Sequence, residues 1–388
     1  MNRRRRVLLA VTIDDSLQFL RGFPQYLVNR GWEVHVVSTP GKRLAELSEI
    51  EGVVTHGIKM DRTPNPLRDI FSFCRWLLVI ASVRPDVVSV GTPKAGLLGS
   101  LAAWMLRVPA RVYLLRGLRL ETSAGLRKQL LVFAERMTMA CASTVVSVSD
   151  SLRELAIEMR LAPSDKIAVL GRGSSNGVDV EVFRPDRIKN GDRAAIASRL
   201  GMDLNVPVVG FVGRLTRDKG LHVLGDAMSA LERRGVNAQV LVLGGVDDES
   251  GANGVAQLRK SCRNIVTTGH VLQPADYYSL MTLLCLPSYR EGFVNVVLEA
   301  SASGIPVVTS DATGVRDAVV DGVTGLTSPV ADADSLADNL ARLLLDPTLA
   351  GSLGANGRKW VVDNFSRERV QDSYANHLEA QLGQEHAQ

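Results

Sequence analysis

Hydrophobic and polar positions follow a repeating pattern along the chain. Short runs of β-branched and aliphatic residues, typical of buried strands, alternate with longer segments in which apolar residues recur every three or four positions. A strand that is regularly followed by an amphipathic helix is the signature of a parallel sheet covered by helices on both faces. The pattern occurs in two series and therefore predicts an α/β protein with two Rossmann-like sheets.

The two series place the strands in separate halves of the chain. In the first half, helices are predicted at 67–83 and 126–141, and strands at 7–12, 33–38, 53–58, 86–90, 111–115, 144–148 and 166–170. In the second half, strands are predicted at 206–212, 238–243, 264–268, 283–286 and 305–309. From Ser335 onward the periodicity predicts three helices, the last over residues 366–381.

Residues 171–205 separate the two series. This stretch is rich in Gly, Arg, Asp and Asn and has no sustained periodicity, as expected where a chain crosses between domains. We predict an N-terminal domain over residues 1–185 and a C-terminal domain over residues 186–365, with a hinge near residues 183–193. The last segment, about residues 366–388, is expected to pack back on the first domain.

The composition is typical of a folded cytoplasmic protein. A length of 388 residues suits two domains of about 150 residues each. A content of 46% hydrophobic and 22% charged residues excludes disorder. The four cysteines form no Cys-x-x-Cys motif, so neither a zinc site nor a disulfide framework is indicated. No apolar run approaches the roughly 18 residues of a membrane-spanning helix.

Two stretches raise the question of contact with an anionic membrane surface. The run from Arg3 to Arg6 precedes the first apolar segment, and such a tail either stays solvated or contacts anionic lipids. The segment 67–83, with Phe71, Phe73, Trp76, Leu77 and Ile80 among several arginines, either packs on the first sheet or lies against a membrane. The net charge of +4 is modest, and no nucleic-acid partner is expected.

Two cations follow the first strand of the second series. Gly213 and Arg214 lie where the predicted strand ends, and Lys219 precedes a glycine at the start of the next helix. Open α/β sheets bind ligands at the carboxyl ends of their strands, and a glycine there lets a ligand approach the backbone. Arginine grips phosphate oxygens in pairs and lysine acts as a point charge, so this motif predicts a diphosphate site. The alternative is a solvated basic loop.

Two glutamates follow another strand of the same series. Glu291 precedes Gly292 on a turn, and Glu299 lies eight residues later, on a helix predicted to begin near Phe293. Free N–H groups at a helix start favour phosphate. Because Glu299 lies among apolar residues, its carboxylate needs a partner. We predict a sugar hydroxyl at Glu291 and a ribose at Glu299, the alternative being a favourable first-turn acid and an exposed glutamate.

These two motifs together resemble the donor site of the retaining GT-B glycosyltransferases of family GT4. The resemblance covers nearly the whole chain. The segment 287–300, Pro-Ser-Tyr-Arg-Glu-Gly-Phe-Val-Asn-Val-Val-Leu-Glu-Ala, is similar to the bacterial capsule, exopolysaccharide and lipid-linked oligosaccharide branch, as are 92–99 and 173–179. The resemblance implies two Rossmann-like domains facing a cleft, with the acceptor in the N-terminal domain and the donor in the C-terminal domain.

The resemblance also implies the substrates and the course of the reaction. The donor is expected to be a nucleotide-diphosphate sugar, in this branch mostly a UDP-sugar, and the acceptor a glycan or a polyprenyl-diphosphate-linked sugar. The group transferred is a hexosyl or N-acetylhexosaminyl residue. Transfer on the front face, in which the leaving phosphate helps to deprotonate the incoming hydroxyl, needs no metal and no cofactor. The work of the protein is then positioning and electrostatic stabilisation.

Individual residues receive roles from the same resemblance. Arg214 and Lys219 are implied at the donor diphosphate, Glu291 at sugar hydroxyls and Glu299 at the ribose. The other implied donor contacts are glycines, the nucleobase turn and the backbone amides at the helix start. These are Gly213, His270, Val271, Gly292, Phe293, Val294 and Asn295.

The chain departs from the family pattern at two loops. Many relatives carry paired glycines after the first strand, whereas here the loop is Thr-Ile-Asp-Asp-Ser, and Ser16 is a candidate contact to acceptor or phosphate. Where family members often place a catalytic-site histidine, this chain has Arg116, which either assists the phosphate or acceptor or is structural. Lys94, after another predicted strand, is either a further contact or a surface lysine.

Several other features are interpreted as structural. The triplet from Asp332 to Asp334 mimics a metal motif but directly precedes a helix pattern, which favours a helix cap. Asn176 and Asp179 are interpreted as turn formers. The histidines at positions 35, 56, 222 and 377 have no paired spacing and are interpreted as isolated structural residues.

Two competing functions share the predicted diphosphate site. A GT-B-like nucleotide-sugar epimerase would act on the donor alone, without an acceptor. A non-catalytic nucleotide-sugar binding protein would need neither the cation pair nor both glutamates, and this chain has all four.

Overall fold

The computed structural model describes residues 4–61, 63, 65–188, 190–262 and 264–383. The chain divides into two compact units. The N-terminal unit takes the chain up to Asn176 and again from Glu368, and the C-terminal unit takes Gly177–Arg367. The domain boundaries proposed from the sequence, at 185 and 365, lie close to these two divisions.

A parallel seven-stranded sheet forms the core of the N-terminal unit, in the order β3-β2-β1-β4-β5-β6-β7. Its central strands are buried, mainly aliphatic runs, as expected for a sheet covered on both faces, whereas the edge strand β3 is largely half-buried or exposed. They are β1 (Arg6–Ala10), β2 (Glu33–Ser38), β3 (Val53–Gly57), β4 (Val87–Gly91), β5 (Ala110–Leu115), β6 (Thr144–Ser147) and β7 (Ile167–Val169).

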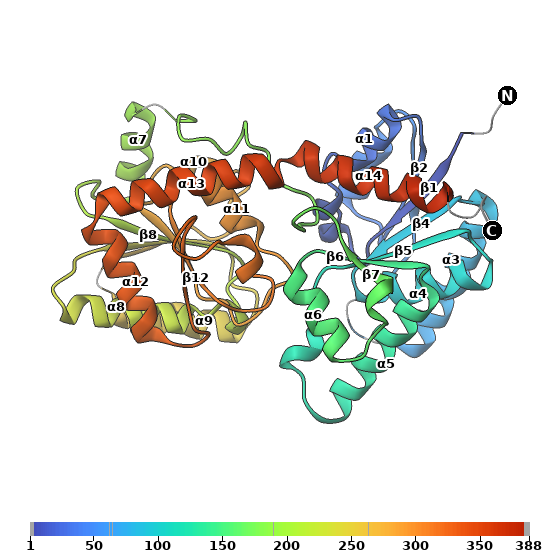
Figure 1. Ribbon diagram of the computed structural model, residues 1–388, viewed down its shortest axis with the longest axis horizontal. Helices are drawn as coiled ribbons and strands as arrows, with labels where there is room; N and C mark the ends of the chain where they lie inside the picture. Colours follow the sequence, from blue (N-terminus) through green and yellow to red (C-terminus); the bar gives the residue numbers. More distant parts are fainter. Residues whose placement is uncertain (1–3, 62, 64, 189, 263, 384–388) are drawn as a thin grey trace. The chain divides into compact units, whose positions relative to one another are not determined.

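Helices cover both faces of this sheet, with α3, α4 and α5 on one side and α1 and α14 on the other (Figure 1). The last helix, α14, packs on the unit through a hydrogen bond between Tyr374 OH and Ser89 Oγ of 2.7 Å. The helices are α1 (Phe23–Asn29), α2 (Lys42–Ser48), α3 (Pro66–Val83), α4 (Pro93–Met105), α5 (Gly125–Cys141), α6 (Asp150–Glu158) and α14 (Arg367–Gly383). Short 3-10 helices are η1 (Asp14–Leu20), η2 (Arg119–Thr122) and η3 (Ser164–Lys166).

The C-terminal unit is built on a parallel six-stranded sheet, in the order β10-β9-β8-β11-β12-β13. Its strands are β8 (Val208–Val212), β9 (Gln239–Leu243), β10 (Ile265–Thr267), β11 (Leu283–Leu286), β12 (Val307–Ser310) and β13 (Leu326–Ser328). Its helices are α7 (Asn190–Leu200), α8 (Leu221–Arg233), α9 (Glu249–Ser261), α10 (Ala275–Tyr278), α11 (Asn295–Ala302), α12 (Ala333–Leu345) and α13 (Pro347–Phe365). Short 3-10 helices are η4 (Arg217–Lys219) and η5 (Arg316–Ala318).

Each sheet has one point at which the direction of strand addition reverses. This switch point lies between β1 and β4 in the N-terminal unit and between β8 and β11 in the C-terminal unit. Loops leaving two such strands run to opposite faces of the sheet and leave a crevice at the carboxyl edge, where open α/β sheets bind ligands. The switch points therefore locate the candidate site in each unit.

The interpretation of the histidines as isolated residues is wrong for two of them. His35 on β2 and His56 on β3 lie on adjacent strands, and their Nδ1 and Nε2 atoms are 3.0 Å apart. His35 Nε2 lies 3.1 Å from the Glu33 carboxylate. Both contacts are satisfied when each histidine is neutral and carries its proton on Nε2. The positions are far apart in sequence, so only the strand register brings them together.

Acidification is expected to weaken the N-terminal unit through this pair. Burial is the main cause that lowers the pKa of His35 and of His56 in the folded protein. The unfolded chain therefore takes up protons first, and the free energy of unfolding falls as the pH drops below about 6.5. In a series of urea unfolding curves from pH 7.5 to pH 5.5, His56→Gln should lose less stability than wild type. An equal loss in the two proteins would contradict this explanation.

Candidate active site

Lys219 and Glu291 come together from the loops that follow β8 and β11. Lys219 Nζ donates a hydrogen bond to Glu291 Oε1, and the two side chains are only 18% and 16% exposed. Ser288 Oγ donates to the same carboxylate oxygen at 3.1 Å. A Cβ placed on Gly213 would lie 4.0 Å from Lys219 Nζ, so the ammonium group lies beside the backbone at the end of β8. Because the pair is largely shielded from water, its electrostatic interaction is stronger than that of a surface salt bridge.

Three consecutive residues of the β8 loop dock on the β11 loop. The Asp218 carbonyl oxygen accepts a hydrogen bond from Tyr289 N at 2.7 Å, and the Asp218 carboxylate pairs with Arg290 at 2.6 Å. The next residue forms the lysine–glutamate pair. A Cβ on Gly220 would lie 1.9 Å from the Pro287 carbonyl oxygen, so the backbones touch there. These contacts fix the spacing of the two loops across the switch point.

Replacing Gly220 by alanine is expected to loosen this loop contact. Gly220 has φ 70° and the added Cβ would collide with backbone, so the free energy of unfolding should fall by at least about 2 kcal/mol. Gly235→Ala is the matched control, because Gly235 has φ 75° but no atom within 4 Å of an added Cβ. That variant should lose only about 1 kcal/mol, the usual cost of a left-handed alanine. Equal losses in urea unfolding would show that the loop contact contributes nothing.

The segment from the β11 loop into α11 supplies an uncapped helix start. Gly292, Phe293 and Val294 lead into the helix, which begins at Asn295, later than the predicted start near Phe293. Val294 occupies the N-cap position, where its side chain makes no capping hydrogen bond, and the first turn contains no acidic residue. Such a helix start presents a positive dipole end to a phosphate.

Glu299 has the partner that its apolar surroundings require. Tyr278 OH donates to Glu299 Oε2 at 2.9 Å and lies 3.2 Å from the Val296 carbonyl oxygen. Burial, reinforced by the nearby carboxylate, raises the pKa of Tyr278 well above its usual value, so the hydroxyl stays protonated. The tyrosine thus orients a partly exposed carboxylate on the second turn of α11.

Arg214 is directed to a different partner from Lys219. Its Nη1 donates to Asp247 Oδ2 at 2.7 Å, and the arginine side chain is 67% exposed. An exposed salt bridge of this kind contributes about 0–1 kcal/mol to stability. Asp247, in the loop after β9, carries no sequence signal that would have predicted this contact.

His270 and Val271 follow β10 in a loop that is joined to the loop after β9. Gly244 N donates to the Gly269 carbonyl oxygen at 2.9 Å, and a Cβ on Gly245 would lie 3.8 Å from His270 Cβ. The His270 side chain is exposed. The residues predicted to contact the donor therefore lie on the loops after β8, β10 and β11 and on the first two turns of α11, along one edge of the sheet.

Arg116 directly follows β5 in the other unit, and its side chain lies beside Gly91 at the end of β4, one of the two strands that flank the switch point. Its Nε and Nη1 atoms are buried and have no hydrogen-bond partner among the described residues. Nη2 donates to the Phe19 carbonyl oxygen at 3.5 Å, and Cζ lies 4.9 Å from the centre of the Phe19 ring. A Cβ on Gly91, the last residue of β4, would lie 2.9 Å from Arg116 Nε. Burial lowers the pKa of Arg116 to about 10, so it remains a cation at neutral pH.

The other two candidates of this unit differ in how they are held. Lys94 is engaged within the unit, because its Nζ donates to Asp69 Oδ1 at 2.6 Å and to the Thr63 carbonyl oxygen at 2.8 Å. Ser16 lies partly buried in η1, where its backbone N–H donates to the Ile13 carbonyl oxygen at 2.9 Å. A ligand at Lys94 would therefore have to compete with Asp69.

His222 lies beside the site and was not predicted there. Its Nε2 is 2.8 Å from Tyr289 OH, and the two rings stack with centroids 5.6 Å apart. His222 is the second residue of α8 and Tyr289 lies in the β11 loop, so this contact also joins the two loops. Nothing in the sequence around His222, which lies two residues after Gly220, predicts its contact with Tyr289.

The interpretation of Asp332 and Asp179 as structural residues is confirmed. Asp332 caps α12, because its carboxylate accepts from Ser335 N at 3.0 Å. Asp179 holds a turn through the backbone N–H of Val182 at 3.0 Å and pairs with Arg367 at 2.9 Å. Within the described part of the chain, no group of three His, Cys, Asp or Glu residues is placed to hold a metal ion.

Two family models match the chain, one in each unit. The sequence model of the family described as glycosyl transferases group 1 matches residues 192–360, and that of the glycosyl transferase 4-like domain matches residues 19–173. The capsular polysaccharide biosynthesis glycosyltransferase CapM of Staphylococcus aureus is 35% identical over 370 residues, which is 95% of each chain. An alpha-maltose-1-phosphate synthase of Mycolicibacterium smegmatis is 30% identical over 72% of this chain and 75% of its own length.

Solved structures of low sequence identity share the fold. A glycosyltransferase from Rickettsia africae superposes with a TM-score of 0.82 at 18% identity, over 98% of this chain and 99% of that one. HepE from Anabaena, crystallised with UDP and glucose, gives a TM-score of 0.81 at 19% identity over 97% and 100% of the two chains. The fold is the GT-B fold, and the chain belongs to the GT4 family of glycosyltransferases.

Proposed function

We propose that this glycosyltransferase moves a hexosyl or N-acetylhexosaminyl group from a UDP-sugar to a glycan or polyprenyl-diphosphate-linked acceptor, in the synthesis of a surface polysaccharide. The observation that carries the proposal is the Lys219–Glu291 pair at the switch point of the C-terminal sheet. The similarity to a capsular polysaccharide enzyme over almost the whole chain supports the pathway. A UDP-glucose complex of a protein with the same fold supports the class of donor.

In this proposal the donor lies along the carboxyl edge of the C-terminal sheet. The uncapped start of α11 and the backbone amides of Phe293 to Asn295 receive the diphosphate. Lys219 and Arg214 neutralise its charge, and Glu291 accepts hydrogen bonds from sugar hydroxyls. Glu299, held by Tyr278, accepts from the ribose, and the backbone at His270 and Val271 contacts the nucleobase. The positions of these residues on the loops after β8, β10 and β11 and on the first two turns of α11 support these roles.

The proposed reaction proceeds with retention of configuration. The bond between the anomeric carbon and the diphosphate oxygen breaks on the same face on which the acceptor hydroxyl attacks, and the leaving phosphate takes the hydroxyl proton. Negative charge then builds on the diphosphate, where Lys219 and Arg214 stabilise it. Arg214 gains a phosphate partner by giving up an exposed salt bridge to Asp247, which costs little.

The acceptor is assigned to the N-terminal unit, at Arg116. A buried guanidinium group with unused donors favours an anion, and a polyprenyl-diphosphate-linked acceptor carries one. Ser16 and Lys94 are secondary candidates at the same edge of that sheet. A lipid-linked acceptor would place the enzyme at the inner face of the membrane, and no divalent metal or other cofactor is proposed.

One experiment separates the proposal from its competitors. The purified protein is screened for thermal stabilisation by a panel of nucleotide sugars, since a ligand of the folded state raises the melting temperature by mass action. The stabilising donor is then incubated alone and with a short-chain polyprenyl-diphosphate sugar. A new glycosidic bond with the anomeric configuration of the donor supports retaining transfer, and the opposite configuration rejects retention. A changed sugar with donor alone would indicate an epimerase, and stabilisation without turnover a binding protein.

A further inference from the structure

Three adjacent helices on one side of the N-terminal sheet carry an unusual concentration of exposed apolar side chains. Of the eighteen exposed large hydrophobic side chains among the described residues, ten lie on or directly after α3, α4 and α5, where α4 packs between the other two. We call this surface the α3–α5 face. Its exposed apolar members are Leu67, Ile70, Phe71, Leu78, Trp104, Met105, Leu106, Leu126, Leu130 and Phe133.

Helix α5 has two apolar stripes, and the protein covers only one of them. The inner stripe, with Thr138 and Met139, is buried against the sheet. The outer stripe, Leu126, Leu130 and Phe133, repeats at helical spacing and is between 62% and 72% exposed. A contiguous exposed apolar surface of this kind is rare on proteins that contact only water and marks an interaction surface.

Helix α3 has the same arrangement. It corrects part of the interpretation of residues 67–83, in which certain apolar residues were membrane-facing candidates. Trp76 and Ile80, which were counted among the membrane-facing candidates, are buried against the rest of the unit. Phe71, another of these candidates, is exposed as expected, and the other outward apolar residues are Leu67, Ile70 and Leu78. Helix α3 therefore both packs on the rest of its unit and presents an exposed apolar side.

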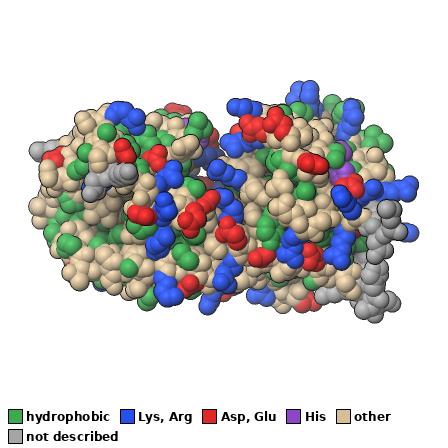
Figure 2. Space-filling view, turned by 90° about the horizontal axis from the view of Figure 1, so that it is seen from above, with side chains coloured by type: hydrophobic (Ala, Val, Ile, Leu, Met, Phe, Trp, Pro, Cys, Tyr) green, Lys and Arg blue, Asp and Glu red, His purple; other side chains and the backbone are tan. Residues whose placement is uncertain are grey.

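The charges on the α3–α5 face are almost all positive. The three helices carry Arg68, Arg75, Lys94, Arg127, Lys128 and Arg136, but only two acidic residues, Asp69 and Glu135. Asp69 is paired with Lys94, and Arg68 is balanced by Asp61 in the preceding loop. Glu135 is buried, accepts from Tyr113 OH at 2.9 Å, and has its pKa raised to about 7 by burial. By contrast, the face seen in Figure 2 has basic and acidic side chains interspersed.

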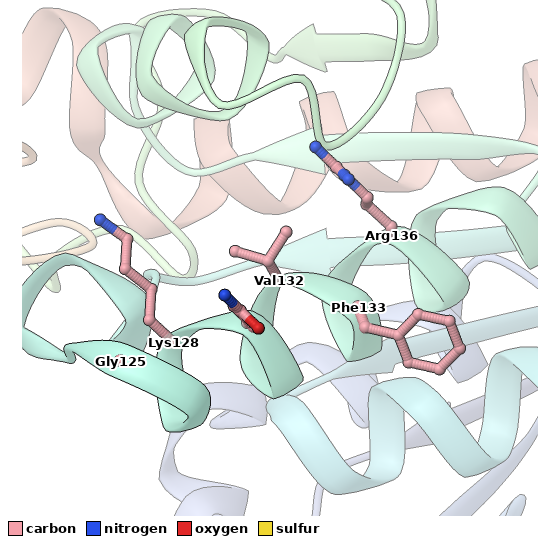
Figure 3. A pocket seen from close by; sticks show the side chains of 6 residues that line it. Gly125, Lys128, Val132, Phe133 and Arg136 are labelled. Atoms are coloured by element: carbon pink, nitrogen blue, oxygen red, sulfur yellow. The ribbon is translucent and has the colours of Figure 1, made fainter.

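A groove along α5 combines the two properties. It has a volume of about 480 Å³ and is lined by Gly125, Lys128, Gln129, Val132, Phe133 and Arg136. Lys128, Val132 and Arg136 project to the same side of the helix (Figure 3), and the backbone positions of the lysine and the arginine are about 12 Å apart along the axis. Arg136 also donates to the carbonyl oxygens of Met159 and Arg160, which fixes its position. An apolar floor between two cations fits the phosphate and upper acyl region of an anionic lipid.

We propose that the α3–α5 face docks on an anionic phospholipid bilayer, with a lipid phosphate in the α5 groove. Apolar side chains enter the boundary between headgroups and acyl chains, and Trp104 is suited to that depth. Arg75, Arg107, Arg127 and Lys128, all exposed, add attraction to anionic lipid. No helix among the described residues has the length and hydropathy to cross a bilayer, so docking is peripheral. The inference rests on the proposed function only in that a lipid-linked acceptor gives the docking a purpose.

The basic N-terminal tail is a weaker candidate for the same contact. Arg3 lies outside the described residues. Arg6 belongs to β1 and pairs with Glu33 at 3.1 Å, so it is not part of a tail. Only Arg4 and Arg5 remain as exposed tail residues within the described chain.

Vesicle co-sedimentation of the full chain tests the proposal. We expect binding to vesicles of phosphatidylcholine with about a third phosphatidylglycerol, weaker binding at high salt, and little binding to phosphatidylcholine alone. Leu126→Ser, Leu130→Ser and Phe133→Ser combined should lower the partition coefficient at least about tenfold, as should Arg127→Glu with Lys128→Glu. The matched controls are Leu272→Ser, Leu345→Ser and Val362→Ser combined, and Lys359→Glu, which alter exposed residues of the C-terminal unit.

The outcomes separate this proposal from its rivals. Unchanged vesicle binding by the α5 variants overturns it, and so does binding that is lost on Arg4→Ala with Arg5→Ala instead. A wild-type dimer that the α5 variants convert to monomer, without vesicle binding, would assign the face to a second copy of the chain. Transfer to a water-soluble acceptor should be unchanged in all α5 variants. Vesicle binding without any transfer would reject the proposed function and leave the docking surface standing.

Discussion

Replacing Lys219 by alanine is expected to lower the rate of sugar transfer at least about a hundredfold, the scale of losing one preorganised donor to a transition-state charge. Lys219 lies beside the backbone of Gly213 and next to Glu291, where the proposed leaving diphosphate gains charge. The loss should appear in kcat as well as in kcat/KM, because the lysine's interaction with the diphosphate strengthens as the bond breaks. The measurement is steady-state transfer with saturating acceptor.

Two further variants separate chemistry from folding. Lys219→Ala leaves the Glu291 carboxylate largely shielded from water and with Ser288 as its remaining side-chain donor, which destabilises the loop. Lys219→Met combined with Glu291→Gln removes both charges and should restore the melting temperature while transfer stays slow. Lys359→Ala, on an exposed pair with Asp363, should match wild type in both respects. Near-normal turnover in the folded double variant would remove Lys219 from the mechanism.

Much of the fold can be predicted from the periodicity of the sequence, because burial largely determines which positions are apolar. Strands such as β8 and β11 are buried along their whole length, and their sequences contain no polar or charged side chain. The predicted helices at 67–83 and 126–141 differ from α3 and α5 by one residue at the start. The strand β13 (Leu326–Ser328) was not predicted, because its sequence, Leu-Thr-Ser, has one aliphatic residue and so forms no apolar run.

The candidate site could be predicted only in part, because sequence gives loop composition but not loop pairing. Lys219 and Glu291 were recognised by their positions after strands, and the sheet order then places these strands side by side. No periodicity or residue spacing in the sequence predicts the contacts of Asp218 with Tyr289 and Arg290. The same holds for the pairing of Arg214 with Asp247, which depends on where the β9 loop ends.

Glu299 and Arg116 differ in whether the described residues supply hydrogen-bond partners for their charged groups. The apolar surroundings of Glu299 required a hydrogen-bond donor, and Tyr278, which sequence did not identify, provides one. Arg116 has a comparable need, but two of its buried nitrogen atoms have no partner among the described residues. A carboxylate held by a hydrogen-bond donor fits an oriented ligand contact, whereas buried donors without a partner fit a group kept for a ligand.

Replacing Arg116 by methionine should therefore separate activity from stability. We expect transfer to fall at least about tenfold, mainly through KM for the acceptor, as a charge-assisted contact to phosphate is lost. The melting temperature should stay the same or rise by roughly 2–4 °C, because a cation with two buried nitrogen atoms that have no partner among the described residues is replaced by an apolar side chain of similar length. The contact with Phe19 offsets part of that gain.

Arg111→Met, on the strand that Arg116 follows, provides the opposite case. Arg111 donates from Nε to the Cys141 carbonyl oxygen at 2.8 Å and from Nη1 to the Val108 carbonyl oxygen at 2.6 Å, so its donors are used within the fold. This variant should lose melting temperature while KM for the acceptor stays unchanged, since its removal leaves backbone acceptors unpaired. If Arg116→Met behaves like Arg111→Met, with lower stability and an unchanged KM, then Arg116 is a structural arginine. The acceptor phosphate would then have to be bound elsewhere in the N-terminal unit.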